Sequence, residues 1–172
     1  MTAASVIMRA GMALALVVAA AASMPVAHAQ GASGQLRAAI IFNVLRFVDW
    51  EQPARELRLC LTRGAPDAGV LTSLHGRAVG TRTLVVRTTA GPSPAGCDAI
   101  YLGPAGAADI RLASQRRVLV IGDGARFIGA GGMVGLVQMG NQIRFEINNA
   151  AARRGGLQIS SKLLRLASRI EQ

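Results

Sequence analysis

The residues that catalyse most enzyme reactions are scarce in this chain of 172 residues. Downstream of residue 29 it contains a single histidine, His75, and two cysteines, Cys60 and Cys97. A histidine-based catalytic triad, or a zinc site built from histidine and cysteine, needs more of these residues. Several carboxylates fall on separate predicted elements, and no two have a spacing that pairs them for general acid–base catalysis: Asp98, Asp109, Asp123 and Glu146. We therefore predict no catalytic residues, no metal site and no cofactor.

Two other patterns have a structural explanation. Glycines cluster between Gly122 and Gly132, but a strand is predicted after Gly132, whereas a dinucleotide-binding glycine motif leads into a helix. Ser160, Ser161 and Lys162 contain the residue types of a Ser–Lys nucleophile. Adjacent residues at a helix start cannot face one another well, and N-capping explains the serines. A hydrolase is therefore the least favoured of the functions that the sequence leaves open.

The first 29 residues have the features of a secretory signal peptide. Arg9 precedes an apolar run over residues 10–22, and the motif Ala27-His28-Ala29 ends the segment. The run has about 13 residues, whereas a helix needs about 20 to span a bilayer; an uncleaved anchor is the alternative. We expect one mature domain in an oxidising extracytoplasmic space, which is the periplasm in a cell that has one.

The two cysteines lie on predicted strands. Cys60 belongs to an alternating run that starts at Leu57, and Cys97 opens another strand. In an oxidising compartment we expect them to form one disulfide. A reactive thiol pair is the alternative, and the absence of a C-x-x-C pattern argues against it.

The chain is strongly basic, with 19 Lys and Arg against 9 Asp and Glu and a net charge of +10. The basic residues are scattered, and only 3% of the residues are aromatic, too few to stack nucleic-acid bases. An exported protein also rarely meets nucleic acid. We predict no nucleic-acid partner, and an acidic partner or a membrane surface stays open.

Hydrophobic periodicity predicts helices that alternate with strands. Residues 30–35 are expected to be loose, and Pro53 ends the first helix. Helices are predicted at residues 36–50, 67–74, 105–115, 149–154 and 162–170, and strands at 57–63, 83–87, 98–102, 117–122, 132–139 and 142–148. The last two strands flank Gly140-Asn141, which is typical of a hairpin. The predicted fold is a single α/β domain with a mostly parallel sheet, flanking helices and an antiparallel C-terminal hairpin.

Several blocks of sequence, in order, resemble the YfiR-like family of periplasmic proteins. Residues 36–50 resemble its opening helix, which carries a basic residue, spaced aromatics and a closing Trp-Pro; here Glu51 and Gln52 separate Trp50 from Pro53. Its C-terminal signature is similar to residues 131–137, 143–148, 150–152 and 156–167. Cys60 and Cys97 fall where the family has a disulfide, and the second cysteine pair of some members is absent. The resemblance assigns residues 36–170 to a YfiR-like domain.

The resemblance implies a regulatory, non-enzymatic role in the periplasm. The best-known member restrains an inner-membrane diguanylate cyclase by binding its periplasmic part, and an OmpA-like outer-membrane lipoprotein relieves the restraint. Cyclic-di-GMP output and biofilm formation follow. The resemblance therefore implies a membrane diguanylate cyclase or sensor kinase as partner, with an OmpA-like lipoprotein and a homodimer as further expectations.

We expect the contact surface on the first helix and on one face of the hairpin. The candidate residues are Phe47, Trp50, Arg144, Glu146 and Asn148. A small-molecule binding protein is the alternative, with a pocket lined by Phe47 and Trp50. The two functions are compatible, because a ligand could tune a repressor.

Overall fold

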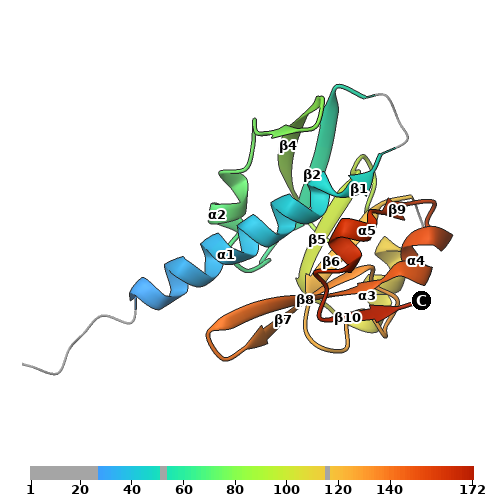
Figure 1. Ribbon diagram of the computed structural model, residues 1–172. Helices are drawn as coiled ribbons and strands as arrows, with labels where there is room; N and C mark the ends of the chain where they lie inside the picture. Colours follow the sequence, from blue (N-terminus) through green and yellow to red (C-terminus); the bar gives the residue numbers. More distant parts are fainter. Residues whose placement is uncertain (1–26, 51–53, 115–116) are drawn as a thin grey trace, which may run out of the picture.

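The computed structural model describes residues 27–50, 54–114 and 117–172. They form an α/β fold whose main sheet has eight strands in the order β10-β8-β7-β6-β5-β2-β4-β3 (Figure 1). Residues 1–26 of the expected signal peptide lie outside the described residues, and Ala27–Ala29 belong to the first helix. Within the described ranges, no helix has the length and apolar character needed to cross a membrane. The predicted fold class is confirmed.

Parallel strands form the centre of the main sheet. β2 (Glu56–Thr62) lies between β4 (Arg82–Thr89) and β5 (Ala99–Pro104), and β6 (Leu119–Asp123) and β7 (Val134–Met139) continue in the same direction. β8 (Gln142–Asn148) returns antiparallel to β7, as the hairpin prediction requires, and Gly140 in the turn has φ +59°. The edges are β10 (Arg169–Glu171), parallel to β8, and β3 (Ala78–Val79), antiparallel to β4.

The helices cover both faces of this sheet. The long helix α1 (Ala27–Arg46) crosses one face, and α3 (Ala107–Ala113) covers part of the other (Figure 1). Three shorter helices are α2 (Ala68–Thr72), α4 (Asn149–Arg154) and α5 (Ser161–Leu164). A separate two-stranded sheet pairs β1 (Val48–Asp49) with β9 (Gln158–Ile159) and so joins the end of α1 to the C-terminal segment.

The alternation of side chains along β2 divides the core into two clusters. Leu57, Leu59 and Leu61 are fully buried in the cluster that contains Ile41 of α1. Cys60 points to the opposite face, into the cluster that contains α3. Side chains that alternate in this way on a sheet covered on both faces give the nearly continuous apolar runs seen in the sequence.

The glycine-rich segment 122–132 makes room for an aromatic side chain. A Cβ at Gly122 would lie 2.0 Å from a ring atom of Phe127, and one at Gly132 would lie 2.1 Å from another. Phe127 is 3% exposed. The ring is therefore held between two glycines, and close packing explains why glycine occupies both positions.

Three expectations about the ends of the domain are wrong. Residues 30–35 belong to α1, in which Gly34 lets the helix approach Asp67: a Cβ there would lie 2.8 Å from Asp67 Oδ1. α1 ends at Arg46, so Trp50 lies beyond the helix. α5 stops at Leu164, although Ser160 caps it as expected, and Ile170 lies on β10. Pairing with β8 outweighs the local helical pattern of residues 165–170, a tertiary contact that periodicity does not show.

Candidate functional site

A cavity of about 350 Å³ opens between α4, β9 and α5. It is lined by Asn149, Arg153, Gly156, Leu157, Gln158, Ile159 and Leu164. The apolar part comes from three aliphatic side chains, and the polar part from two amides and a guanidinium. None of the lining residues is acidic.

Local structure explains why this cavity forms where β8 ends. The buried Asn148 caps α4, because its Oδ1 accepts a hydrogen bond from the Ala151 N–H at 2.8 Å. α4 has only six residues, and Gly156, with φ +71°, turns the chain back into β9. Asn149 and Arg153 are four residues apart on this helix and therefore share a face.

Asn149 is the most informative residue of the cavity. It is only 8% exposed, yet its side-chain amide makes no hydrogen bond to any part of the chain that the structure describes. The amide instead faces the cavity, which also contains Arg153 and Gln158 in its lining. The amide offers two N–H donors and one acceptor to a molecule that enters the cavity.

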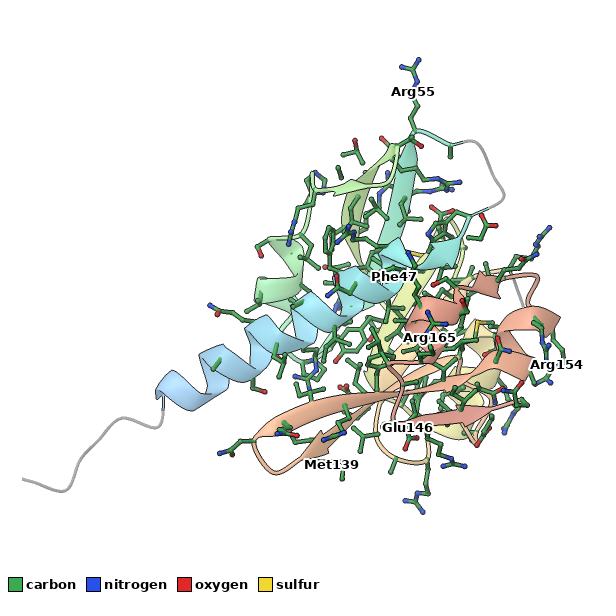
Figure 2. All side chains as sticks on the ribbon, in the orientation of Figure 1. Phe47, Arg55, Met139, Glu146, Arg154 and Arg165 are labelled. Carbon is green, nitrogen blue, oxygen red and sulfur yellow. A yellow bond between two sulfur atoms is a disulfide. The ribbon has the colours of Figure 1, made fainter. Side chains whose placement is uncertain are left out.

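The surroundings of the cavity are basic. Arg153 and Arg154 end α4, and Lys162 lies on α5. Nη2 of Arg117 donates a hydrogen bond to the carbonyl of Gly156 at 3.2 Å. In Figure 2, Arg154 projects outward from the molecule at the end of α4. An anionic group is therefore favoured at the mouth of the cavity.

Phe47 and Trp50 lie close to one wall of this cavity. The carbonyl of Phe47 accepts a hydrogen bond from the Ser160 N–H at 2.9 Å, and Val48 pairs with Ile159. Both aromatic side chains are half-buried against the main core, and the Trp50 Nε1–H donates to the carbonyl of Leu45 at 2.9 Å. Neither is among the lining residues of the cavity.

The structure separates the three hairpin candidates. Arg144 is exposed, and its Nη2 lies 3.3 Å from Gln142 Oε1. Glu146 is largely buried beside β10, with its Oε2 3.9 Å from Nη1 of Arg169. Asn148, expected on the contact surface, is instead buried, and its Nδ2 donates inward to Ile128 O at 3.0 Å and Glu171 Oε2 at 2.9 Å. Side chains alternate between the two faces along β8 as expected. The end of β8, however, is covered by β10 and by the loop that precedes β7.

A second polar cluster lies at the carboxyl ends of β5 and β6, and sequence reasoning missed it. Arg37 of α1 contacts both Asp67 Oδ2 through Nη1, at 2.5 Å, and Asp123 Oδ1 through Nε, at 3.5 Å. The Tyr101 hydroxyl donates to Asp123 Oδ2 at 2.7 Å. The side chains of Arg37 and Asp123 are 12% exposed, that of Asp67 is 25% exposed, and Tyr101 is fully buried. We call these four residues the Arg37 cluster.

The electrostatics of the Arg37 cluster follow from this burial. Burial, followed by the charge of Asp123 and the hydrogen bond to it, raises the pKa of Tyr101 well above its usual value. Burial alone would lower the pKa of Arg37, but Tyr101 and the carboxylates of Asp123 and Asp67 outweigh it and raise the pKa. Asp67 adopts φ +57°, uncommon for a residue other than glycine. Its carboxylate binds Arg37 and does not cap α2. The cluster therefore fixes α1 on the sheet.

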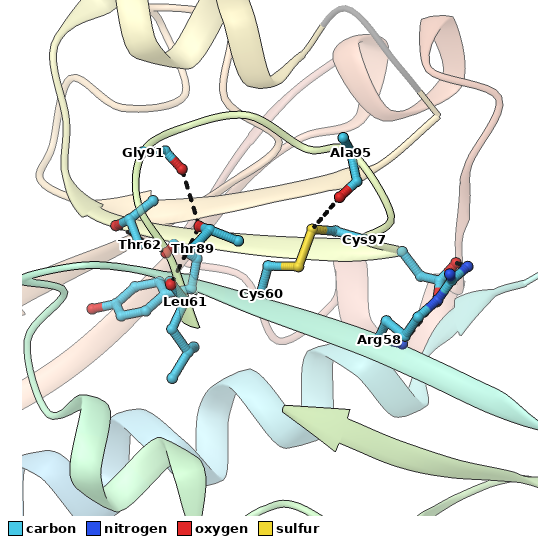
Figure 3. The surroundings of a disulfide bond; sticks show 10 residues. Arg58, Cys60, Leu61, Thr62, Thr89, Gly91, Ala95 and Cys97 are labelled. Carbon is cyan, nitrogen blue, oxygen red and sulfur yellow. Dashed lines mark hydrogen bonds and ion pairs between the residues drawn. A yellow bond between two sulfur atoms is a disulfide. The ribbon is translucent and has the colours of Figure 1, made fainter. Parts of the chain in front are cut away.

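The two cysteines form a disulfide that ties β2 to the segment just before β5 (Figure 3). Arg58 and Asp98 form an ion pair beside it, with Nε and Oδ2 3.2 Å apart. The bridge closes a loop with a sequence separation of 37 residues, which contains α2, β3 and β4. The expected disulfide is confirmed.

Comparison with known proteins supports a family assignment. A structure from Vibrio cholerae, described as a conserved domain protein, superposes with a TM-score of 0.52 at 15% identity and covers 80% of this chain. The L-Trp complex of an ABC domain from Streptococcus pneumoniae gives a TM-score of 0.48 at 12% identity and the same 80% coverage. This chain spans 60% and 61% of those two chains. No curated protein matches significantly. The family model described as YfiR/HmsC-like matches residues 34–168, and the chain therefore belongs to the YfiR/HmsC-like family.

Proposed function

We propose that this protein is a periplasmic repressor that binds the periplasmic part of an inner-membrane signalling protein. The partner is a diguanylate cyclase or a related sensor, and binding lowers its cyclic-di-GMP output without any catalysis by the repressor. The observation that carries this proposal is the family match, which extends over nearly the whole expected mature chain.

The Cys60–Cys97 disulfide supports the location. Structural disulfides persist in oxidising compartments and are rare in the bacterial cytosol. Together with the expected signal peptide over residues 1–29, this favours export to the periplasm. The proposal includes two finer features, a homodimer and release of the repression by an OmpA-like lipoprotein.

Repression requires a difference in affinity between two states of the partner. A protein that binds both states of a sensor equally well shifts no equilibrium. This protein would therefore bind the inactive state of the periplasmic sensor more tightly than the active state. A tenfold preference corresponds to about 1.4 kcal/mol.

A gene deletion tests the proposal. Deletion should raise intracellular cyclic-di-GMP and biofilm mass, and a plasmid copy of the full chain should restore both. A copy with its first 29 residues removed should not restore them, because the protein would stay in the cytoplasm. Unchanged cyclic-di-GMP in the deletion strain would refute the proposed function.

A second candidate function is binding of a small molecule in the cavity between α4, β9 and α5. The observation in its favour is that the amide of Asn149 and the guanidinium of Arg153 both line an apolar-walled cavity. Arg153 would bind a carboxylate, and Leu157, Ile159 and Leu164 would contact an apolar part of the same molecule.

A panel of small carboxylates, screened by thermal shift, tests this second function. A ligand of the cavity should lose most of its stabilising effect in Arg153→Gln and Asn149→Ala. Arg154→Gln is the matched control, because Arg154 is adjacent and exposed but does not line the cavity. A ligand that stabilises all four proteins equally would bind elsewhere.

A further inference from the structure

The outer edge of β4 is only partly covered. β4 is next to last in the main sheet, and its outer neighbour β3 pairs with just two of its residues, Arg82 and Thr83. Beyond them, the Leu84 N–H donates to the carbonyl of Arg77 and its carbonyl accepts from the Gly76 N–H, both at 2.8 Å. Among the residues that the structure describes, no strand pairs with residues 85–89 of β4 on that side.

The direction of each backbone group along β4 can be assigned. The Thr83 N–H donates to Arg55, just before β2, and the carbonyl of Thr89 accepts from Arg63, just after β2, both at 2.9 Å. The backbone N–H and C=O groups of odd-numbered residues therefore bond to β2. Those of even-numbered residues point away from β2, since the direction alternates from one residue to the next along a strand. The outward groups are those of Leu84, Val86 and Thr88.

Only the first part of this outward row is satisfied. Leu84 is paired as described, and the Val86 N–H donates to Nδ1 of His75 at 3.2 Å. The Val86 carbonyl and both backbone groups of Thr88 have no hydrogen-bond partner within residues 27–50, 54–114 and 117–172. His75 thus accepts the hydrogen bond of the Val86 N–H, and the unpaired outward groups begin with the Val86 carbonyl. We call the segment from Val86 to Thr88 the β4 edge.

The surface around the β4 edge carries positive charge, and the stretch of chain that contains β4 supplies no carboxylate. Residues 68–97 contain no Asp or Glu. Arg87 is exposed on β4 itself, and Arg63 is exposed beside Thr89. Neither forms an ion pair within the residues that the structure describes. An acidic segment would therefore be attracted to this edge.

We propose that the β4 edge is the docking site for an extended, acidic segment of the membrane partner, which adds to the main sheet as a further strand. This inference rests on the proposed function and specifies where the partner binds. Backbone hydrogen bonds to the Val86 carbonyl and to both backbone groups of Thr88 hold the added strand, as in other cases of strand addition. The acidic side chains of the added strand lie on the same face of the sheet as Arg87. There they can pair with Arg87, since side chains opposite each other on neighbouring strands interact.

The alternation of β4 also sets what the other face of the added strand contacts. Val86 is half-buried and packs against the main core, so an apolar side chain beside it would extend that core. The partner segment should therefore alternate acidic and apolar residues. Proteins commonly protect exposed strand edges with charged side chains, and Arg87 would also disfavour edge-to-edge pairing of two copies through β4.

Thr88→Pro tests the backbone contact. Proline removes the outward N–H, which bonds to nothing in the described protein, and leaves the ladder to β2 intact; proline is tolerated on edge strands for this reason. Thr88→Ala is the matched control, because it changes only the side chain. Arg87→Glu tests the charge.

The assay is the affinity of the full chain for the purified periplasmic part of the cyclase whose output rises on deletion, measured by calorimetry. We expect at least tenfold weaker binding for Thr88→Pro and for Arg87→Glu, and less than a twofold change for Thr88→Ala. Unaltered melting temperatures check that each variant is folded. Adding salt should weaken binding of the unmodified protein more than binding of Arg87→Glu.

The outcomes separate this inference from the proposed function. If the unmodified protein binds the cyclase and both Thr88→Pro and Arg87→Glu bind equally well, the docking site is wrong and the regulatory function stands. If Thr88→Ala weakens binding as much as Thr88→Pro, the contact is made by the side chain and strand addition is refuted. If the unmodified protein does not bind, the proposed function fails and the docking site fails with it.

Discussion

Replacement of Arg37 by leucine should destabilise the domain more than any other single change of an Arg on α1. Arg37 is the cation between Asp67 and Asp123, whose side chains are 25% and 12% exposed. Leucine would leave both carboxylates without a positive partner beneath α1. Removing one member of a buried ion pair costs about 3–5 kcal/mol. Because Asp67 is a quarter exposed and partly hydrated, we expect the lower end, about 3 kcal/mol.

Urea denaturation, followed by circular dichroism, measures this effect. With a slope of about 2 kcal/mol/M, a loss of about 3 kcal/mol lowers the midpoint by about 1.5 M. Arg46→Leu is the matched control, because Arg46 is exposed at the end of the same helix and has no ion-pair partner in the described part of the chain. We expect it to change stability by less than about 0.5 kcal/mol.

A double variant tests whether the loss comes from the carboxylates. Asp67→Asn in the Arg37→Leu background should recover part of the stability, because it removes one of the two uncompensated charges. The reasoning would be refuted if Arg37→Leu and Arg46→Leu unfolded at the same urea concentration. It would also fail if Asp67→Asn destabilised the Arg37→Leu protein further.

Three other predictions follow from the core and the disulfide. Cys60→Ser should lower the free energy of unfolding by about 4 kcal/mol, because the loop between Cys60 and Cys97 is no longer closed in the unfolded chain. A reducing agent should lower the melting temperature of the unmodified protein but not that of Cys60→Ser. Tyr101 is the only tyrosine, and its pKa is raised in the folded state. The folded protein therefore favours the neutral phenol. The contribution of Tyr101 to the free energy of unfolding is complete below the unfolded pKa of about 10, and it declines by about 1.4 kcal/mol per pH unit above that pKa. Alkaline denaturation should therefore be less steep in Tyr101→Phe, and an equally steep curve would contradict the assignment. Gly132→Ala should cost about 1–3 kcal/mol by crowding the ring of Phe127, and Phe127→Leu in the same chain should restore part of it in thermal melts.

Local sequence patterns were sufficient for most of the elements. Strict alternation predicted β8, and Gly140-Asn141 predicted its turn, because a two-residue hairpin depends on neighbouring residues. The apolar run before Gly122 predicted a buried parallel strand, and β6 is one. The prediction failed where a distant contact decided the outcome, as in β10, whose residues have a helical pattern but pair with β8.

Long-range packing also decided the polar clusters. Arg37 is 30 residues from Asp67 and 86 from Asp123 in the sequence, and no spacing rule links them. The helix α1 brings them together because it packs on the face of the sheet, with Arg37 close to the carboxyl end of β6. Asn149 follows Asn148 directly, and only the cap of α4 determines that Asn148 is satisfied inside the protein while Asn149 faces a cavity.

The amino-acid sequence by itself determined the α/β class, the cysteines that form the disulfide and the resemblance to the YfiR-like family. These depend on hydrophobic periodicity, residue type and ordered blocks along the chain. Tertiary structure decided that Asn148 is unavailable to a partner, that Arg37 joins two carboxylates, and that β4 has an open edge. Each of these depends on which distant segment covers a given backbone or side-chain group, and that is settled only when the sheet and its helices pack together.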